Sequence, residues 1–404
     1  MADFGLSAFA LFFLQSGSFL SFQRKLEKGQ GRSNCQTLFG IEKIPSDNYI
    51  RDMLDGADPA RLAPCFEDVE RRLHEPAMRE AFGRLGGRTL VALDGTEYFC
   101  SQKIACPHCL TRKRSNGKTE SYHAMLAASV VAPGHAKVVP LAPEFIVKQD
   151  GAEKQDCERN AVKRWHEKHA RRLKPLRPIY LADDLFSCQS VVKTLVDAGD
   201  DFIFTAKETS HKGLYDFIAG AELTRHEVKV RKGKTHETHR YWFIDNVPLR
   251  DGKDAVLVNW IGFEIADAKG VVKYRTALVT SLPVTKANVA EIVACGRARW
   301  KIENESFNVL KNNGYELEHN FGHGEAYLAM TLAALNMLAF AWHTTLDLLE
   351  PPWRKARDAA EKRTTFFAYV ATLTSFVVFP DWRAILEALA DFTIPKSVLS
   401  PKFE

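Results

Sequence analysis

The spacing of hydrophobic and polar residues changes near residue 88 of this chain. Before that point apolar residues recur at helical spacing, as in residues 50–54 and 60–73. The pair Asp58-Pro59 supplies an N-cap and a first-turn proline for the second of these segments. From Thr89 onward the period shortens to that of β-strands. The pattern therefore predicts a helical N-terminal module over residues 1–85, of a kind that could bind DNA.

The next segment alternates between strand-like and helix-like patterns. Strands are expected at residues 89–93, 122–131, 137–147, 178–182 and 201–206, and helices at residues 156–174 and 188–198. Three strands followed by helix, strand, helix and strand is the order of a ribonuclease H-like core. We therefore expect an α/β fold with a mixed sheet flanked by helices, the first part of which covers residues 86–206.

A β-rich block then interrupts the core. Antiparallel patterns occur at residues 227–230, 239–244, 255–265 and 271–282, separated by the turns Lys232-Gly233 and Lys269-Gly270. We interpret residues 207–282 as an insertion. A helix over residues 287–312, stopped by Gly314, is expected to complete the core within residues 283–346, and residues 347–404 to form a helical tail.

Two apolar segments raise the question of a membrane. Residues 4–22 follow no Lys or Arg and contain polar interruptions, which is not typical of a signal peptide. Residues 326–345 have no charged side chain over nearly the length of a membrane span, but they include Asn336 and His343. We expect a buried N-terminal helix and a core helix, in a cytoplasmic protein without membrane contacts.

Composition and charge favour a polyanionic partner only weakly. The 404 residues are 46% hydrophobic and carry a net charge of +5. The basic residues gather at 112–118, 163–177 and 229–234, and such clusters suit contacts with phosphates. Arg112, Lys113 and Arg114 are the candidates for one DNA-contacting tip. Any one cluster alone is equally compatible with a solvated surface.

The eight cysteines have no spacing typical of a disulfide framework, which indicates reduced thiols. Only Cys106-Pro-His-Cys109 has the spacing of a metal-ligand pair. With Cys100 before it and His123 after it, this pair could supply four soft ligands to a structural Zn²⁺. The alternative is that Cys106 and Cys109 are free thiols on a basic hairpin.

Three acidic residues stand where a divalent metal site could form. Asp94 and Asp183 each close an apolar strand, and the carboxyl ends of strands are common ligand-binding positions in α/β sheets. On a regular helix Glu303 falls in the same apolar stripe as Trp300, whereas Glu305 lies almost opposite. Because a carboxylate in an apolar stripe is costly unless it meets a cation, Glu303 is the expected metal ligand.

Each of these positions also has an ordinary structural role open to it. Aspartates after strands are common in turns, and Asp184 lies beside Asp183, so only one of the two side chains should face the site. Glu303 could form an intrahelical ion pair with Arg299 at i, i+4. Both roles are compatible, since an arginine beside a metal ligand can also bind phosphate. Crowded carboxylates repel one another unless cations neutralise them, which favours the metal site.

The carboxylates lie in segments with a recognisable pattern: Val91 to Thr96 (VALDGT), Asp183 to Phe186 (DDLF), and Arg299 to Glu303 (RWKIE) with Phe307 and Lys311. In these segments, and over about residues 94–346, the chain resembles the DDE transposases of bacterial insertion sequences. The resemblance is to the group whose catalytic helix carries a Tyr-Arg-Glu-Lys pattern. Two positions depart from it: Gly296 replaces the tyrosine, and Lys311 is one residue farther from Glu303.

The resemblance implies a site and an activity. Asp94, Asp183 and Glu303 would bind two Mg²⁺ or Mn²⁺ ions at a scissile phosphate, and Arg299 and Lys311 would contact phosphates. DNA would be cleaved and joined by in-line phosphoryl transfer without a covalent enzyme intermediate. The implied partners are double-stranded DNA, as terminal inverted repeats and target, and a second copy of the chain on that DNA. The implied location is the bacterial nucleoid, and no small-molecule substrate is expected.

Two other functions remain alternatives. The chain could be a catalytically silent, transposase-derived protein that binds DNA or regulates transcription. It could also be a ribonuclease H-like nuclease without strand transfer. The presence of an acidic residue at all three positions argues against a decayed site.

Overall fold

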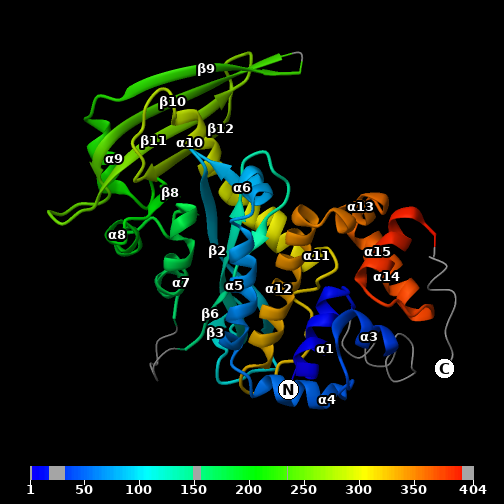
Figure 1. The fold of residues 1–404 in the computed structure, drawn as a ribbon. Coiled ribbons are helices and arrows are strands. Elements are labelled where there is room, and N and C mark those ends of the chain that lie inside the picture. Colours follow the sequence, from blue (N-terminus) through cyan, green and yellow to red (C-terminus); the bar gives the residue numbers. More distant parts are fainter. Residues whose placement is uncertain (1, 18–31, 149–155, 234, 394–404) are drawn as a thin grey trace, which may run out of the picture.

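The fold is built around one mixed β-sheet. This computed structural model describes every residue except 1, 18–31, 149–155, 234 and 394–404, and the described residues form a twelve-stranded sheet. Its strands are β1 (Gly83–Arg84), β2 (Arg88–Ser101), β3 (Leu110–Lys113), β4 (Thr119–Val131), β5 (Val139–Pro140), β6 (Glu144–Ile146), β7 (Ile179–Ala182), β8 (Asp201–Thr205), β9 (Thr224–Lys232), β10 (Thr235–Pro248), β11 (Leu257–Ala266) and β12 (Val272–Thr280). The long strands β9 to β12 extend from one end of the central core (Figure 1).

The order of the strands divides the sheet into a core and an extension. Hydrogen-bonded neighbours run β3, β4, β2, β7, β8, β12, β11, β10 and β9, with β5 and β6 also on β4, and β1 on β2. Strands β2, β7 and β8 are parallel, whereas β4 is antiparallel to β2 and β12 is antiparallel to β8. The β-rich block is therefore not a separate layer, because its last strand continues the core sheet at the edge of β8.

Helices cover the core strands. Leu90 to Leu93 are consecutive buried residues, and such a run is expected for strands covered on both faces. Helix α7 (Glu158–Leu173) contacts β2, β4 and β6, while α8 (Gln189–Asp197) and α10 (Val289–Arg297) contact β8. In the extension, α9 (Lys212–Ala219) packs on β10. The helix and strand positions predicted between residues 156 and 206 are confirmed.

The N-terminal residues are helical, as predicted. They form α1 (Ala2–Phe13), α3 (Arg32–Phe39), α4 (Asp47–Asp55), a 3₁₀ turn (Pro59–Leu62), α5 (Ala63–Arg72) and α6 (Pro76–Phe82). Asp58 accepts a hydrogen bond from the Ala60 amide at 2.8 Å, which confirms the predicted cap. The buried N-terminal helix is confirmed as far as Phe13, and residues 18–22 of that prediction lie outside the described residues.

Helix α12 (Leu328–Leu349) runs through the interior of the molecule (Figure 1). Its length and apolar composition would be sufficient to cross a membrane, but 78% of its apolar window is buried by the rest of the molecule. It contacts α1, α4, α5 and β5. This burial confirms the prediction of a core helix.

The C-terminal helices pack against the N-terminal ones. They are α13 (Pro351–Ala359), α14 (Arg363–Phe376) and α15 (Trp382–Asp391). The Phe13 ring lies 5.8 Å from Trp353 and 5.4 Å from Trp382, centroid to centroid. The Asn34 side chain donates to the carbonyl oxygens of Thr374 and Val377. The two ends of the described chain thus share one aromatic cluster, which stabilises both.

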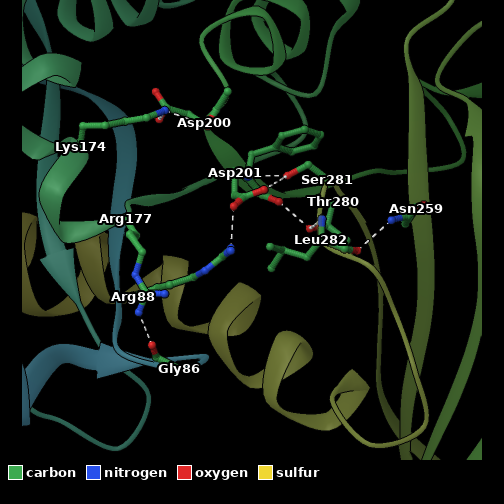
Figure 2. A network of polar contacts seen from close by, with 12 residues as sticks. Gly86, Arg88, Lys174, Arg177, Asp200, Asp201, Asn259, Thr280, Ser281 and Leu282 are labelled. Carbon is green, nitrogen blue, oxygen red and sulfur yellow. Dashed lines mark hydrogen bonds and ion pairs between the residues drawn. The ribbon is translucent and has the colours of Figure 1, made fainter.

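A polar network joins the core to the extension at the amino end of β8 (Figure 2). Asp201 is ion-paired with Arg88 and accepts a hydrogen bond from the Ser281 hydroxyl at 2.8 Å. Beside it, the Thr280 hydroxyl donates to the Phe202 carbonyl at 2.6 Å. These bonds connect β2, β8 and the end of β12, and so join the extension to the core.

The segment 137–147 differs from the prediction of one strand. It contains two short strands, β5 and β6, both paired with β4. Pro143 lies in the break between them, and a proline cannot donate a hydrogen bond within a sheet. The outer edge of β4 is consequently covered by β3, β6 and β5 in turn.

Candidate functional site

The register of the core strands brings two predicted carboxylates together. In the parallel pair of β2 and β7, Ala92 is opposite Leu181. Continuing this register by two residues sets Asp94 beside Asp183, which directly follows β7. The neighbouring Asp184 turns away, because it accepts hydrogen bonds from the Lys207 amide and the Ser210 hydroxyl. Of the two aspartates, Asp183 is therefore the one beside Asp94.

Arg299 joins Asp94 to the third predicted carboxylate. Its guanidinium contacts Asp94 Oδ2 at 3.1 Å and Glu303 Oε1 at 2.7 Å. The Arg299 and Asp94 side chains are each 18% exposed, whereas the Glu303 side chain is 51% exposed. The predicted intrahelical pair of Arg299 and Glu303 exists, and the arginine also reaches the sheet.

The carboxylates crowd one another electrostatically. The pKa of Asp94 is raised to about 7, chiefly by burial and also by the charges of Asp183, Glu303 and Glu158, which together outweigh the lowering effect of Arg299. One guanidinium does not compensate for these negative charges. The arrangement favours the binding of further cations.

The helix that carries Glu303 is not regular, which corrects the sequence prediction. After α10 the chain forms a 3₁₀ turn (Ala298–Trp300), a π-helical turn (Ile302–Phe307) and α11 (Asn308–Asn312). Ile292, Phe307 and Leu310 of the predicted stripe are buried, but Glu303 and Trp300 are both about half exposed. The expected contrast between the two glutamates is wrong, because Glu305 is the less exposed of the two. A tighter turn followed by a wider one rotates side chains away from the phase of a regular helix. Glu303 faces the open side of the site rather than the core.

Close packing explains why position 296 is a glycine, where the resembled pattern has a tyrosine. A Cβ atom at this position would lie 2.7 Å from Leu278 Cδ1 and 2.8 Å from Ile203 Cγ2. Helix α10 approaches β8 and β12 closely there. Gly296 also lines a cavity of about 330 Å³ that adjoins Arg299 and Trp300.

The sequence reasoning missed a fourth carboxylate, Glu158 in the first turn of α7. A Cβ atom at Gly95 would overlap the Glu158 carboxylate, so Gly95 leaves room for this side chain beside Asp94. Burial raises the pKa of Glu158, and the charges of Asp183 and Glu97 add to the effect. An acidic residue in the first turn is common in any helix, and this hid Glu158 in the sequence.

The other predicted phosphate contacts are placed less directly. Lys311 forms an ion pair with Glu318 at 2.7 Å. Arg112 is ion-paired with Glu97 and Glu120, and Arg114 with Glu120, while Lys113 is exposed. In the second basic cluster, ion pairs within the chain occupy Arg164, Lys168, Arg172 and Lys174. Much of the clustered positive charge is therefore used to hold the fold.

A second cluster of metal-ligand types lies near the carboxyl end of β2, beyond Asp94. It consists of Cys106 and Cys109 in the loop between β2 and β3, His123 on β4, and His323 in the loop before α12. One ligand atom from each of these residues lies within 4.8 Å of the other three. Cys100 is exposed and is not in the cluster, so the expected fourth ligand is replaced by a residue more than 200 positions away.

Comparison with known proteins does not assign this chain. It matches no protein-family model, and no curated protein matches it significantly. The site must therefore be interpreted from its own geometry.

Proposed function

We propose that this chain is a DNA transposase that cleaves and joins the ends of its own mobile element by metal-dependent phosphoryl transfer. The observation that carries the proposal is the convergence of Asp94, Asp183 and Glu303 on one site, with Arg299 between two of them. A cytoplasmic location, in contact with the nucleoid, belongs to the same proposal.

The strand order supports a ribonuclease H-like core. Antiparallel β2, β4 and β6 are followed by α7, by β7 parallel to β2, by α8, and by β8 parallel to β7. In mixed sheets of this kind, ligands bind at the carboxyl ends of strands. Asp183 directly follows β7 and Asp94 is its neighbour across the sheet, which is the placement that the proposal needs.

The donor set fits a hard divalent cation such as Mg²⁺ or Mn²⁺. Such ions take carboxylate oxygens, and the unbalanced negative charge around Asp94 is what a cation would neutralise. Asp94, Asp183 and Glu303 would hold it. When bound, a pair of such ions lowers the pKa of an attacking hydroxyl and stabilises the leaving oxygen.

The residues of the chain would position DNA around this centre. Arg299 can bind a backbone phosphate in place of its present contacts, since a guanidinium matches phosphate geometry in two-point contacts. Lys113 lies exposed at the tip of the β3 hairpin and could contact DNA farther away. Among the described residues, the side chains that act on Asp94 are carboxylates and one arginine, which supports direct attack by water or a DNA hydroxyl rather than by a Ser or Tyr side chain.

The test is cleavage of a labelled duplex that carries the DNA found at the ends of the encoding element. Purified protein is incubated with this duplex, with and without Mg²⁺, alongside Asp94→Asn, Asp183→Asn and Glu303→Gln variants. We expect Mg²⁺-dependent nicking and strand transfer that each variant loses while it still binds DNA.

Glu305→Gln is the matched control, because it removes a carboxylate from the same π-helical turn. It should cleave like the unmodified protein. Binding without cleavage under any metal would favour the regulatory alternative, and cleavage without joining would favour the nuclease. Loss of activity in Glu305→Gln alone would show that the wrong helical carboxylate has been chosen.

A further inference from the structure

The four side chains of the Cys/His cluster have the separations of a tetrahedral zinc site. Cys106 Sγ lies 3.8 Å from Cys109 Sγ, and each sulfur lies 3.4 Å from His123 Nε2. His323 Nε2 lies 3.6 Å from Cys109 Sγ. With Zn–S of about 2.3 Å and Zn–N of about 2.0–2.1 Å, the edges of a tetrahedron are about 3.8 Å between sulfurs and about 3.5 Å from sulfur to nitrogen.

A disulfide or a redox-active thiol pair fits the cluster less well than zinc does. The 3.8 Å separation of the two sulfurs is far from the roughly 2.05 Å of a disulfide. A redox pair would also not require two imidazoles whose Nε2 atoms are directed at the sulfurs. Cys109 and His123 are buried, at 2% and 1% exposed, so the centre of the cluster is closed to solvent. A closed set of four ligands is typical of structural zinc.

We propose that Cys106, Cys109, His123 and His323 bind a structural Zn²⁺ ion. Binding deprotonates the two thiols, and each histidine coordinates through Nε2. The metal attaches the loop between β2 and β3 and strand β4 to the loop that precedes α12.

His323 gives the site its structural consequence. Its loop, residues 313–327, connects α11 to α12, so it begins directly after the helical segment that carries Glu303. The start of α12 is fixed from the other side by Asp55, whose carboxylate accepts from the amides of Glu325, Ala326 and Leu328 at 2.9 Å each. The zinc ion would fix the middle of this loop on the edge of the core sheet.

The site is tested by metal content and by spectroscopy on the full chain. The protein is purified without added metal, and its zinc is measured by mass spectrometry. We expect about one zinc per chain. After exchange for Co²⁺ we expect the visible bands of a tetrahedral site together with charge-transfer absorption from two thiolates. A chain that binds no zinc under these conditions, or a Co²⁺ spectrum without thiolate bands, would overturn the proposal.

Single substitutions identify the ligands. Cys109→Ser and His323→Ala should weaken zinc binding by more than the roughly 10–100-fold that the loss of an outer-shell partner costs. The exposed Cys100→Ser is the matched control and should retain the metal. Unchanged zinc affinity in His323→Ala would remove this residue from the site.

A rescue experiment separates a lost ligand from a misfolded variant. The cavity left by His323→Ala can accept free imidazole, so added imidazole should restore the Co²⁺ spectrum of the unmodified protein. If Co²⁺ remains bound but imidazole leaves its spectrum unchanged, His323 is not a ligand. The result does not depend on DNA cleavage, so the zinc proposal and the transposase proposal succeed or fail separately.

Discussion

The carboxylate site and the Cys/His cluster use the same part of the fold in opposite ways. Each takes at least one residue from the β2–β4 region and at least one from the segment that follows β12. The carboxylate site is open, with Glu303 half exposed, and its groups repel one another. The cluster is closed, and its groups already stand at the separations of a coordination shell. The first suits an ion that takes part in chemistry, and the second an ion that holds the structure.

The difference is also one of local charge. At Asp94 a carboxylate stays partly protonated near neutral pH because burial and the neighbouring acids raise its pKa. At His123, burial lowers the pKa to about 4, with smaller contributions from His323 and His108, so the imidazole is neutral and free to act as a ligand. Because the folded state disfavours the charged form of Asp94, the carboxylate site lowers the stability of the protein at neutral pH. Such a cost is common at functional sites.

The largest effect is expected for a substitution at the carboxylate site. Asp94→Asn removes one ligand and one charge while keeping the size of the side chain. We expect cleavage to fall by about 10³-fold or more, with DNA binding retained. Cleavage rate and gel-shift affinity, measured on the same duplex, check this. Equal losses in both would indicate a folding defect instead.

The second effect is a loss of stability when zinc is removed from the Cys/His cluster. Removing zinc with a strong chelator should lower the melting temperature, because metal that binds only the folded state stabilises it. The contribution is about 4 kcal/mol when free zinc exceeds its dissociation constant by 1,000-fold. Calorimetry before and after chelation measures it, and re-added zinc should restore the original value. Removing Mg²⁺ alone leaves the zinc bound, so any stability lost in that way should not be restored by added zinc.

The third effect concerns pH and the metal-free carboxylate site. The folded protein holds a proton on Asp94 up to a pKa of about 7, above the range of an unfolded aspartate, so stability falls as the pH rises through this window. Asp94→Asn lacks this penalty. Without Mg²⁺, its free energy of unfolding should exceed that of the unmodified protein by roughly 2–3 kcal/mol more at pH 8 than at pH 5. Thermal unfolding at both pH values tests this.

Added Mg²⁺ provides the control for that comparison. At pH 8 it should stabilise the unmodified protein and leave Asp94→Asn nearly unchanged. A difference between the two proteins that does not vary with pH would mean that Asp94 titrates in its ordinary range.

The sequence predicted the parts of each site that lie in local patterns. The apolar runs before them identified Asp94 and Asp183, although Asp94 does not end its strand, because β2 continues to Ser101. The Cys-x-x-Cys spacing identified Cys106 and Cys109. The ligand His323 could not be found this way, because about 200 residues of chain separate it from Cys109 and only the packing of α12 returns it to β4.

The second feature that the sequence could not predict was the rotational phase of the helix that carries Glu303. A regular wheel placed Glu303 in a buried stripe, whereas the 3₁₀ and π-helical turns leave it half exposed. Glu303 was thus selected by an argument about burial that the structure does not support. The π-helical turn packs against β2 and β4, and such tertiary contacts are not encoded in local spacing.

The smallest expected effect concerns Glu158, and it shows whether this residue is a metal ligand or acts only through its charge. Its charge acts on Asp94, but its carboxylate approaches from the side of Gly95. Glu158→Gln removes one negative charge at constant size, so the remaining carboxylates should attract cations less strongly. We expect the Mg²⁺ concentration for half-maximal cleavage to rise by about 3–10-fold, with little change in rate at saturating Mg²⁺. Glu97→Gln, in which the lost carboxylate belongs to an ion pair with Arg112, should change this concentration less. A rate that stays low at saturating Mg²⁺ would instead make Glu158 a ligand, because excess metal compensates for weakened attraction but not for a missing coordination bond.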